Sequence, residues 1–344
     1  MTCLCIFIGA AFFFVVIETS HSMGRYADKN GVAYDVTDAA QVARDVAYAR
    51  TLDVPALTKY FKEISDDAGA AYAYEILRQL PQSDFHPYIH LFGHIIGDEL
   101  FDQQNIEGLS ICTTEFSFAC YHSVIARAIA EEGFENIGEI NKRCLKLRDV
   151  GSCQHGIGHG IMAAIAYGDP VAAIAVCDSL EKRPGVTRPC AEGVLMEFNF
   201  HQLEDTTEAG YRQVDERGYY YPCTDMPDAY TSECYFEQTN WWRNVLGRSN
   251  YPAIGALCDA VENDEDRAWC YRGIGRLIPE YSTDSAEVMA SSCIGATAAE
   301  EGQALCLQEL REVTKANTSL CDRIEGPYAD VCRMSVPELV IASP

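Results

Sequence analysis

Helical patterns of apolar residues alternate with short turn-forming stretches along most of the chain. Residues 171–180, VAAIAVCDSL, and residues 190–200, CAEGVLMEFNF, both have helical patterns, and the stretch KRPGVTRP at 182–189 between them is rich in turn formers. Comparable pairs of helical segments recur further along the chain. These patterns predict an all-α protein that is built from helical hairpins.

The cysteines mark the period of these hairpins. Fourteen of the 16 cysteines form seven pairs 8 to 13 residues apart, and the second members follow one another at intervals of 33, 37, 44, 36, 36 and 26 residues. Such a period is typical of helical-hairpin repeats. We therefore predict an α-solenoid of about eight hairpins with a period of about 33–37 residues, seven of them stapled by one disulfide between the end of the first helix and the start of the second. The predicted pairs are Cys112–Cys120, Cys144–Cys153, Cys177–Cys190, Cys223–Cys234, Cys258–Cys270, Cys293–Cys306 and Cys321–Cys332.

The N-terminal part of the chain lacks these pairs but has similar helical patterns. Residues 68–102 have the pattern of one further hairpin without cysteines. We expect capping helices within residues 23–66 and the disulfide-stapled repeat domain over 67–344, whose first half (86–201) is rich in histidine. In plan this organisation resembles the disulfide-stapled members of the Sel1 and tetratricopeptide class, although the W-x-x-L-G-x-x-Y pattern of the latter is absent.

The chain begins with features of an exported protein. Residues 3–17, CLCIFIGAAFFFVVI, are apolar over a length that suits a signal peptide, so we predict a signal peptide over 1–22, with a short uncleaved anchor as the alternative. Sixteen cysteines without any C-x-x-C motif favour disulfides over zinc ribbons or redox motifs. We expect a secreted, periplasmic or extracellular location, which is an oxidising compartment.

The charge of the chain limits its partners. Acidic residues outnumber basic ones by 51 to 26, which gives a formal net charge of -25. Such a surface repels the phosphates of nucleic acids and anionic membranes. We therefore expect no nucleic-acid partner, and membrane association only if the N-terminal segment is retained.

One short motif combines glycines with histidines. Residues 153–160 read CQHGIGHG, and residues 270–276 repeat its frame as CYRGIGR with arginines in place of the histidines. The glycines therefore belong to the repeat, and we predict that they let the neighbouring helix pack closely. The histidines are a substitution made on that frame, four residues apart and on one helical face.

Histidines of the first half form two similar sets. His90, His94 and His122 make one triplet, and His155, His159 and His201 make another, each an H-x-x-x-H pair followed by a single histidine. Two carboxylates, Glu192 and Glu197, lie in the same region, whereas His86 precedes a proline at a predicted helix entrance and is set aside. Imidazole-rich sites with few carboxylates suit copper, iron or zinc. The pattern predicts a site for two metal ions.

The two triplets resemble the ligand pattern of the type-3 dicopper proteins, the haemocyanins and phenol oxidases. The resemblance implies a coupled copper centre that reacts with dioxygen. A dinuclear iron site of the haemerythrin kind, with Glu192 and Glu197 as bridging ligands, is the first competitor, and a single zinc ion held by His155, His159 and one further ligand is the second. The remaining interpretation is that the histidines are buried hydrogen-bonding residues. No organic cofactor is indicated.

Arginines take the places of the histidine pair in the second half. Arg272 and Arg276 are candidates for binding a carboxylate or phosphate on a concave face, and ion pairs with Glu237, Glu280 or Glu309 are the alternative. The leading prediction is an exported metalloprotein with redox or oxygen chemistry, acting on a small-molecule substrate or protein partner at that face. A metal carrier or sensor without turnover, and a scaffold for protein interaction without metal, are the alternatives.

Overall fold

The chain is helical, as predicted, apart from one very short pair of strands. The computed structural model describes residues 26–27, 33–34, 38–81, 88–182, 189–200, 210–280, 282, 284–316 and 318–335. The predicted signal peptide and the predicted ligand His201 lie outside these residues. Strand β1 (Tyr26–Ala27) pairs antiparallel with β2 (Ala33–Tyr34).

The α-helices follow one another with short connections. Those of the first half are α1 (Ala39–Ala49), α2 (Val54–Ala68), α3 (Ala70–Gln79), α5 (Ile89–Gln104), α6 (Ala119–Glu132), α7 (Ile137–Cys144), α8 (Val150–Ala164), α9 (Pro170–Ser179) and α10 (Pro189–Phe200). Those of the second half are α11 (Asp228–Leu246), α12 (Tyr251–Asp259), α13 (Asp264–Glu280), α14 (Ala286–Ala296), α15 (Glu300–Thr314) and α16 (Pro327–Arg333). Short 3-10 helices are η1 (Asn105–Ser110), η2 (Phe116–Phe118), η3 (Phe134–Asn136), η4 (Cys223–Asp225) and η5 (Thr318–Arg323).

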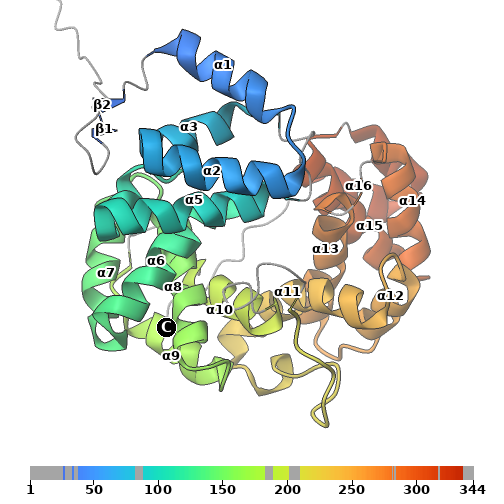
Figure 1. The fold of residues 1–344 in the computed structure, drawn as a ribbon. Coiled ribbons are helices and arrows are strands. Elements are labelled where there is room, and N and C mark those ends of the chain that lie inside the picture. The colour runs from blue at the N-terminus through green and yellow to red at the C-terminus, as the bar shows by residue number, and fades with distance from the viewer. Residues whose placement is uncertain are drawn as a thin grey trace, which may run out of the picture.

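One series of helices packs side by side along the whole chain. Helices α5, α6, α8, α10, α11, α13, α15 and α16 each contact the next member of the series. We call these the inner helices. Figure 1 shows that the chain follows a curved path, from the N-terminal helices through α8 and α10 to the C-terminal helices on the other side. Residues on equivalent faces of consecutive inner helices are thereby brought close together.

The seven cysteine pairs predicted from the sequence lie at disulfide distance, which confirms the pairing. Their Cα atoms are 5.4 to 5.8 Å apart. The second cysteine of every pair lies in an inner helix, from α6 to α16. Seven disulfides in one chain indicate an oxidising compartment.

Three units differ from the predicted hairpin. Cys112 follows η1, Cys223 lies in η4 and Cys321 lies in η5, so a 3-10 helix stands where the pattern predicts an α-helix. The causes are local. Pro222 directly precedes Cys223, and only six residues separate the end of α15 from Cys321, which is too few for a returning α-helix.

Glycines allow the inner helices to approach closely, as predicted. A Cβ atom at Gly158 in α8 would lie 2.0 Å from the carbonyl oxygen of Cys190, and one at Gly193 in α10 would lie 2.0 Å from that of His155. The equivalent Gly275 of the CYRGIGR motif would meet Cys306 in the same way, at 2.2 Å. The frame of glycines is therefore a feature of the packing and is independent of the histidines.

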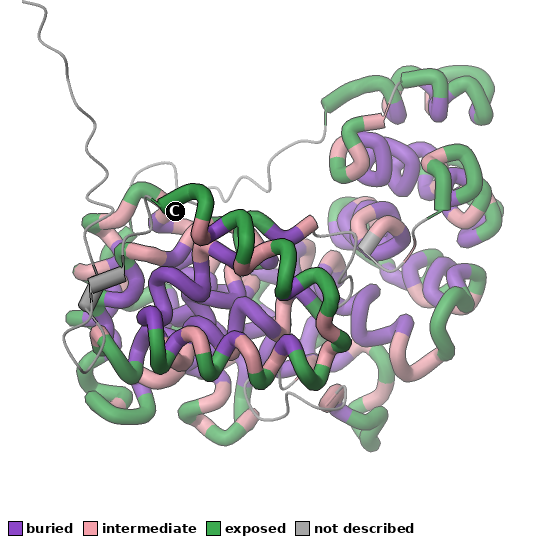
Figure 2. The backbone as a smooth tube through the Cα atoms, turned by 45° about the horizontal axis from the view of Figure 1, so that its top comes forward, coloured by how far each residue is buried: buried purple, intermediate pink, exposed green. Residues whose placement is uncertain are grey.

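The core lies among the inner helices, while the outer turns face solvent. Figure 2 shows the buried segments gathered in the interior and the exposed segments around the periphery. Helix α8 has neighbours on both sides, α6 and α10, and nearly all of its residues are buried. Within the described residues, no helix combines the length and the apolar character needed to cross a bilayer.

Candidate metal centre

Three consecutive inner helices carry the histidines. His90 and His94 lie on α5, His122 on α6, and His155 and His159 on α8. The i, i+4 spacing places both members of each pair on one helical face. Four of the five are buried, with exposed fractions of 6% for His94, 1% for His122, 2% for His155 and 0% for His159. These four imidazoles are therefore enclosed within the helix packing.

The five histidines form one cluster with His122 at its centre. His122 belongs to two groups of potential ligands, one with His90 and His94 and one with His155 and His159, and the nitrogens of each group lie within 4.8 Å of one another. The His122 ring centroid is 4.2 Å from that of His159 and 5.4 Å from that of His94. The structure thus brings together five of the six predicted histidines, and one of them is shared between the two groups.

Hydrogen bonds fix the first pair from outside the cluster. His90 donates its Nδ1 proton to the Phe116 carbonyl oxygen at 2.7 Å, because a carbonyl can only accept. His94 Nδ1 lies 2.9 Å from Ser123 Oγ. The Nε2 atoms of the two histidines face each other at 3.0 Å. With its proton on Nδ1, neutral His90 presents a bare lone pair at Nε2.

The second pair is fixed in a similar way by a carboxylate. His159 Nδ1 lies 2.7 Å from Oε2 of Glu197 on α10, and the other oxygen of Glu197 accepts a hydrogen bond from Tyr167 at 3.0 Å. His155 Nε2 and His159 Nε2 are again 3.0 Å apart. Because the Glu197 carboxylate accepts the Nδ1 proton of His159, the Nε2 lone pair of His159 points toward His155. Histidines that bind metals are commonly oriented in this way.

His155 lies between two groups that can accept a hydrogen bond. Its Nε2 atom faces the lone pair of His159, and its Nδ1 atom is 3.5 Å from Oε2 of Glu192, beyond hydrogen-bond distance for the buried nitrogen. A neutral His155 can donate to only one of these acceptors. A second proton on His155 or a metal ion between the Nε2 atoms satisfies both, and two nitrogens bound to one ion lie ~3 Å apart.

His122 is the clearest sign of a missing partner. Among the described residues, neither of its ring nitrogens has a hydrogen-bond partner, although the side chain is almost completely buried. Leaving a buried polar group without a partner costs about 1–3 kcal/mol. The His122 ring lies between the two histidine pairs, so metal ions bound there would satisfy its nitrogens.

Burial keeps the histidines in the uncharged form that binds metals. It lowers the pKa of His94, His122 and His159 well below the usual value of 6.5, and the neighbouring histidines lower it further. Burial opposes ionisation of Glu192 too, but the nearby His155 and the charge of Arg276 outweigh it and lower the pKa of Glu192 to about 2. Three neutral imidazoles of the cluster therefore lie near an ionised carboxylate.

An arginine of the second half reaches this carboxylate. Arg276 on α13 lies 3.6 Å from Glu192 and 2.6 Å from the buried Glu237 on α11. The ion pair with Glu237 is one of the alternatives predicted from the sequence. Arg272 instead donates to Gln308 and stacks over Trp269, with 4.9 Å between the guanidinium carbon and the ring centroid. Binding of an anion by either arginine remains a prediction.

Sequence reasoning did not find the groups that orient the imidazoles. Ser123 directly follows His122, and Tyr167 ends the turn after α8, but nothing in their spacing signals a bond to His94 or to Glu197. The Phe116 carbonyl is a backbone group, so the residue type at this position does not indicate its role. The identity of these partners depends on the side-chain directions at the helix contacts.

Comparison with other proteins gives no further guide to this site. No family model, no curated protein and no solved structure matches the chain. The interpretation of the histidine cluster therefore depends on its own geometry.

Proposed function

We propose that this chain is an exported metalloprotein whose histidine cluster holds two metal ions and performs redox or oxygen chemistry. The observation that carries the proposal is His122, whose two buried nitrogens have no partner among the described residues and whose ring lies between two pairs of facing Nε2 atoms. Copper is the first choice, iron the second and zinc the third, because the site is rich in imidazole and poor in carboxylate.

The proposed ligands differ in one respect from the two separate triplets. His90, His94 and His122 hold the first ion, and His155, His159 and His122 hold the second. A histidine that binds an ion through each ring nitrogen must lose both ring protons, which the buried site and two cations favour. His201, four residues after Glu197, is the alternative third ligand of the second ion, and His122 then serves the first ion alone.

The carboxylates take different roles in this proposal. Both oxygens of Glu197 are engaged by His159 and Tyr167, so Glu197 orients a ligand from outside. Glu192 has one oxygen 3.5 Å from His155 and is partly exposed, which makes it the carboxylate available to the second ion. A centre in which Glu192 and Glu197 both bridge the ions would favour iron.

We also propose that the repeats form an α-solenoid behind a leader that directs export. The contacts of each inner helix with the next, the seven local disulfides and the repeated glycine frame support the solenoid. The disulfides support an oxidising compartment, where residues 1–22 would act as the signal peptide. A substrate or partner would reach the centre from the concave face.

Metal analysis of the disulfide-bonded protein tests the proposal. After reconstitution, we expect about two ions per chain in the wild type and fewer than one in His122→Ala, because both groups lose a ligand. Gln154→Ala is the matched control on α8, since Gln154 bonds to Asn141 and to the Glu181 carbonyl, away from the cluster.

Each outcome separates the proposed functions. Absence of bound metal in the wild type contradicts the proposal and leaves the protein-interaction scaffold. Tight metal without reaction with dioxygen or a redox partner favours the carrier or sensor. One ion per chain that His122→Ala leaves in place would contradict the shared ligand and favour a single zinc ion at His155 and His159.

A further inference from the structure

A cavity opens beside the histidine cluster, between the inner helices α5, α6 and α8. Its volume is about 580 Å³, which is within the range of sites for small organic molecules. His94 contributes to its wall, and so does Gly160, the residue after His159. The cavity therefore reaches the cluster at His94.

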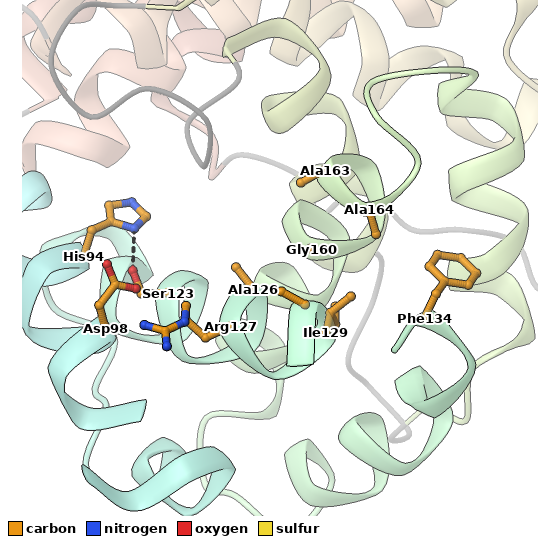
Figure 3. A pocket seen from close by; sticks show the side chains of 11 residues that line it. His94, Asp98, Ser123, Ala126, Arg127, Ile129, Phe134, Gly160, Ala163 and Ala164 are labelled. Atoms are coloured by element: carbon orange, nitrogen blue, oxygen red, sulfur yellow. Dashed lines mark hydrogen bonds between the residues drawn. The ribbon is translucent and has the colours of Figure 1, made fainter. Parts of the chain in front are cut away.

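The two ends of the cavity differ in polarity. Figure 3 shows His94, Ser123 and Asp98 together at one end and Phe134 at the opposite end. Between them the wall is apolar, with Ala126, Ile129 and Ala163 among its residues. A ligand that fills this space has a polar group near the cluster and an apolar body extending toward Phe134.

Hydrogen bonds connect the polar end to the cluster. Ser123 Oγ lies 2.9 Å from His94 Nδ1, and the Ser123 hydroxyl donates to the carboxylate of Asp98. A group bound at Asp98 is thus two hydrogen bonds away from the imidazole of His94. This arrangement places the head of a ligand next to a proposed metal ligand.

The charge at the polar end is negative. Arg127 is the cation in the wall, and it already binds Asp102 at 2.6 Å and Glu131 at 3.2 Å. Arg127 therefore already pairs with two carboxylates, and Asp98 is a third carboxylate near it. Asp102 and Glu131 do not line the cavity, but together with Asp98 they outnumber the one guanidinium near its polar end, so a cationic head is favoured over a neutral or anionic one.

We propose that this cavity binds an organic ammonium ion with an apolar body, with its head at Asp98 and its body against Ala126, Ile129 and Ala163. The cavity is then the substrate site of the histidine centre, a role that rests on the proposed function. An ammonium group donates hydrogen bonds to Asp98, and the apolar wall excludes water from the body of the ligand.

Calorimetric titration of the full-length, disulfide-bonded, metal-free protein tests the binding site. The probes are 2-phenylethylammonium, the neutral 2-phenylethanol and the anionic phenylacetate, which share one apolar body. We expect the ammonium to bind at least ~10-fold more tightly than the alcohol, as for a single charge-assisted contact, and phenylacetate to bind least.

Two variants test separately whether the polar end and the apolar end of the cavity bind the ligand. Asp98→Asn should abolish the preference for the ammonium over the alcohol. Ala163→Leu should weaken both by about 10-fold or more by filling the apolar part. Glu132→Gln is the control for long-range charge, because Glu132 is exposed and outside the wall, and it should leave every Kd within about twofold. Any of three results would overturn the proposed binding site: equal binding of the ammonium and the alcohol, an unchanged Kd for the ammonium in Asp98→Asn, or no binding of any probe.

A second measurement tests the link with the metal centre separately. In Cu²⁺-loaded protein, saturating 2-phenylethylammonium should change the visible absorption of the bound copper. If the probe binds and that spectrum stays constant, the cavity is not the substrate site of the centre. If the protein takes up no metal, the proposed function fails, and the titrations of the metal-free protein still decide whether the cavity binds ammonium ions.

Discussion

Gly158 on α8 and Gly193 on α10 lie directly against each other's helix backbone. A Cβ atom at either position would come within 2.0 Å of a carbonyl oxygen of the other helix, that of Cys190 or of His155. The His155 and Glu192 side chains meet, and Glu197 reaches His159, because the two helices approach this closely. The glycines therefore determine the geometry of the second half of the histidine cluster.

Gly158→Ala should destabilise the protein, because backbone atoms of α10 cannot move away as a flexible side chain could. We expect a loss of about 2–3 kcal/mol in the free energy of unfolding, measured by denaturant titration. Gly138→Ala on α7 is the matched control, since no atom lies within 4 Å of the added Cβ. The control should be neutral or stabilising by about 0.5–1 kcal/mol. Equal effects of the two substitutions would contradict the close contact.

Replacing His122 by phenylalanine should separate stability from metal binding. The ring is retained, while two buried nitrogens without partners are removed. The metal-free variant should be as stable as the metal-free wild type or more stable by about 1 kcal/mol, and it should no longer be stabilised by metal. Thermal unfolding with and without copper measures both effects. A large loss of stability in the metal-free variant would show that these nitrogens have partners in the protein.

Glu197→Gln should weaken metal binding without removing a ligand. The carboxylate accepts the Nδ1 proton of His159 and increases the basicity of Nε2, and an amide does so less well. We expect a loss of about 10–100-fold in affinity, measured by competition with a chelator of known affinity. Tyr167→Phe removes only the bond to the other oxygen of Glu197 and should have a smaller effect. A larger effect of Tyr167→Phe would contradict this order.

The metal-free protein should lose stability as the pH falls below about 6.5. The folded state holds the pKa of His94, His122 and His159 well below that of the unfolded chain, chiefly by burial. The unfolded chain therefore binds more protons, and the free energy of unfolding decreases with falling pH by up to about 1.4 kcal/mol per unit for each histidine.

Urea titrations between pH 7 and pH 5 measure this dependence. The slope should be smaller in His122→Phe, since one such histidine is absent, and bound metal should hold the wild type folded to lower pH. A wild-type stability that stays constant across this range would contradict the lowered pKa values.

Removal of Arg276 should leave a buried carboxylate without its cation. Glu237 is 1% exposed and lies 2.6 Å from Arg276, and burial raises its pKa. Arg276→Met should cost about 3–5 kcal/mol, and adding Glu237→Gln should recover part of this loss. Arg333→Met removes an exposed ion pair and should cost less than about 1 kcal/mol. Failure of Glu237→Gln to compensate would mean that Arg276 acts through other contacts.

The sequence was sufficient for the features that repeat along the chain. The cysteine spacing predicted all seven disulfide partners, and the glycines shared by CQHGIGHG and CYRGIGR predicted the close helix contacts. The i, i+4 spacing of two histidine pairs, on helices expected to be neighbours, predicted that they converge. These features follow from the period of the helix and of the repeat.

Other features of the site depend on side-chain contacts that the periods of the helix and of the repeat do not determine. His122 has neighbours on both sides because α6 packs between α5 and α8, so the division into two independent triplets by sequence order did not anticipate a shared residue. The role of Glu197 depends on which of its oxygens faces His159. The 3-10 helices that contain Cys223 and Cys321 arise from proline-containing or short connections that interrupt the helical pattern.

The local pairing of the cysteines has a consequence for biogenesis. Partners are 8 to 13 residues apart, whereas the first cysteine of the following unit is 23 or more residues after the second member of each of the first five pairs. Closing the shorter loop costs less entropy, so the correct partner is favoured before any tertiary structure exists. In an oxidising compartment each unit can therefore form its own disulfide independently of the others, so the units that carry the histidine helices can be stapled before the rest of the chain has folded.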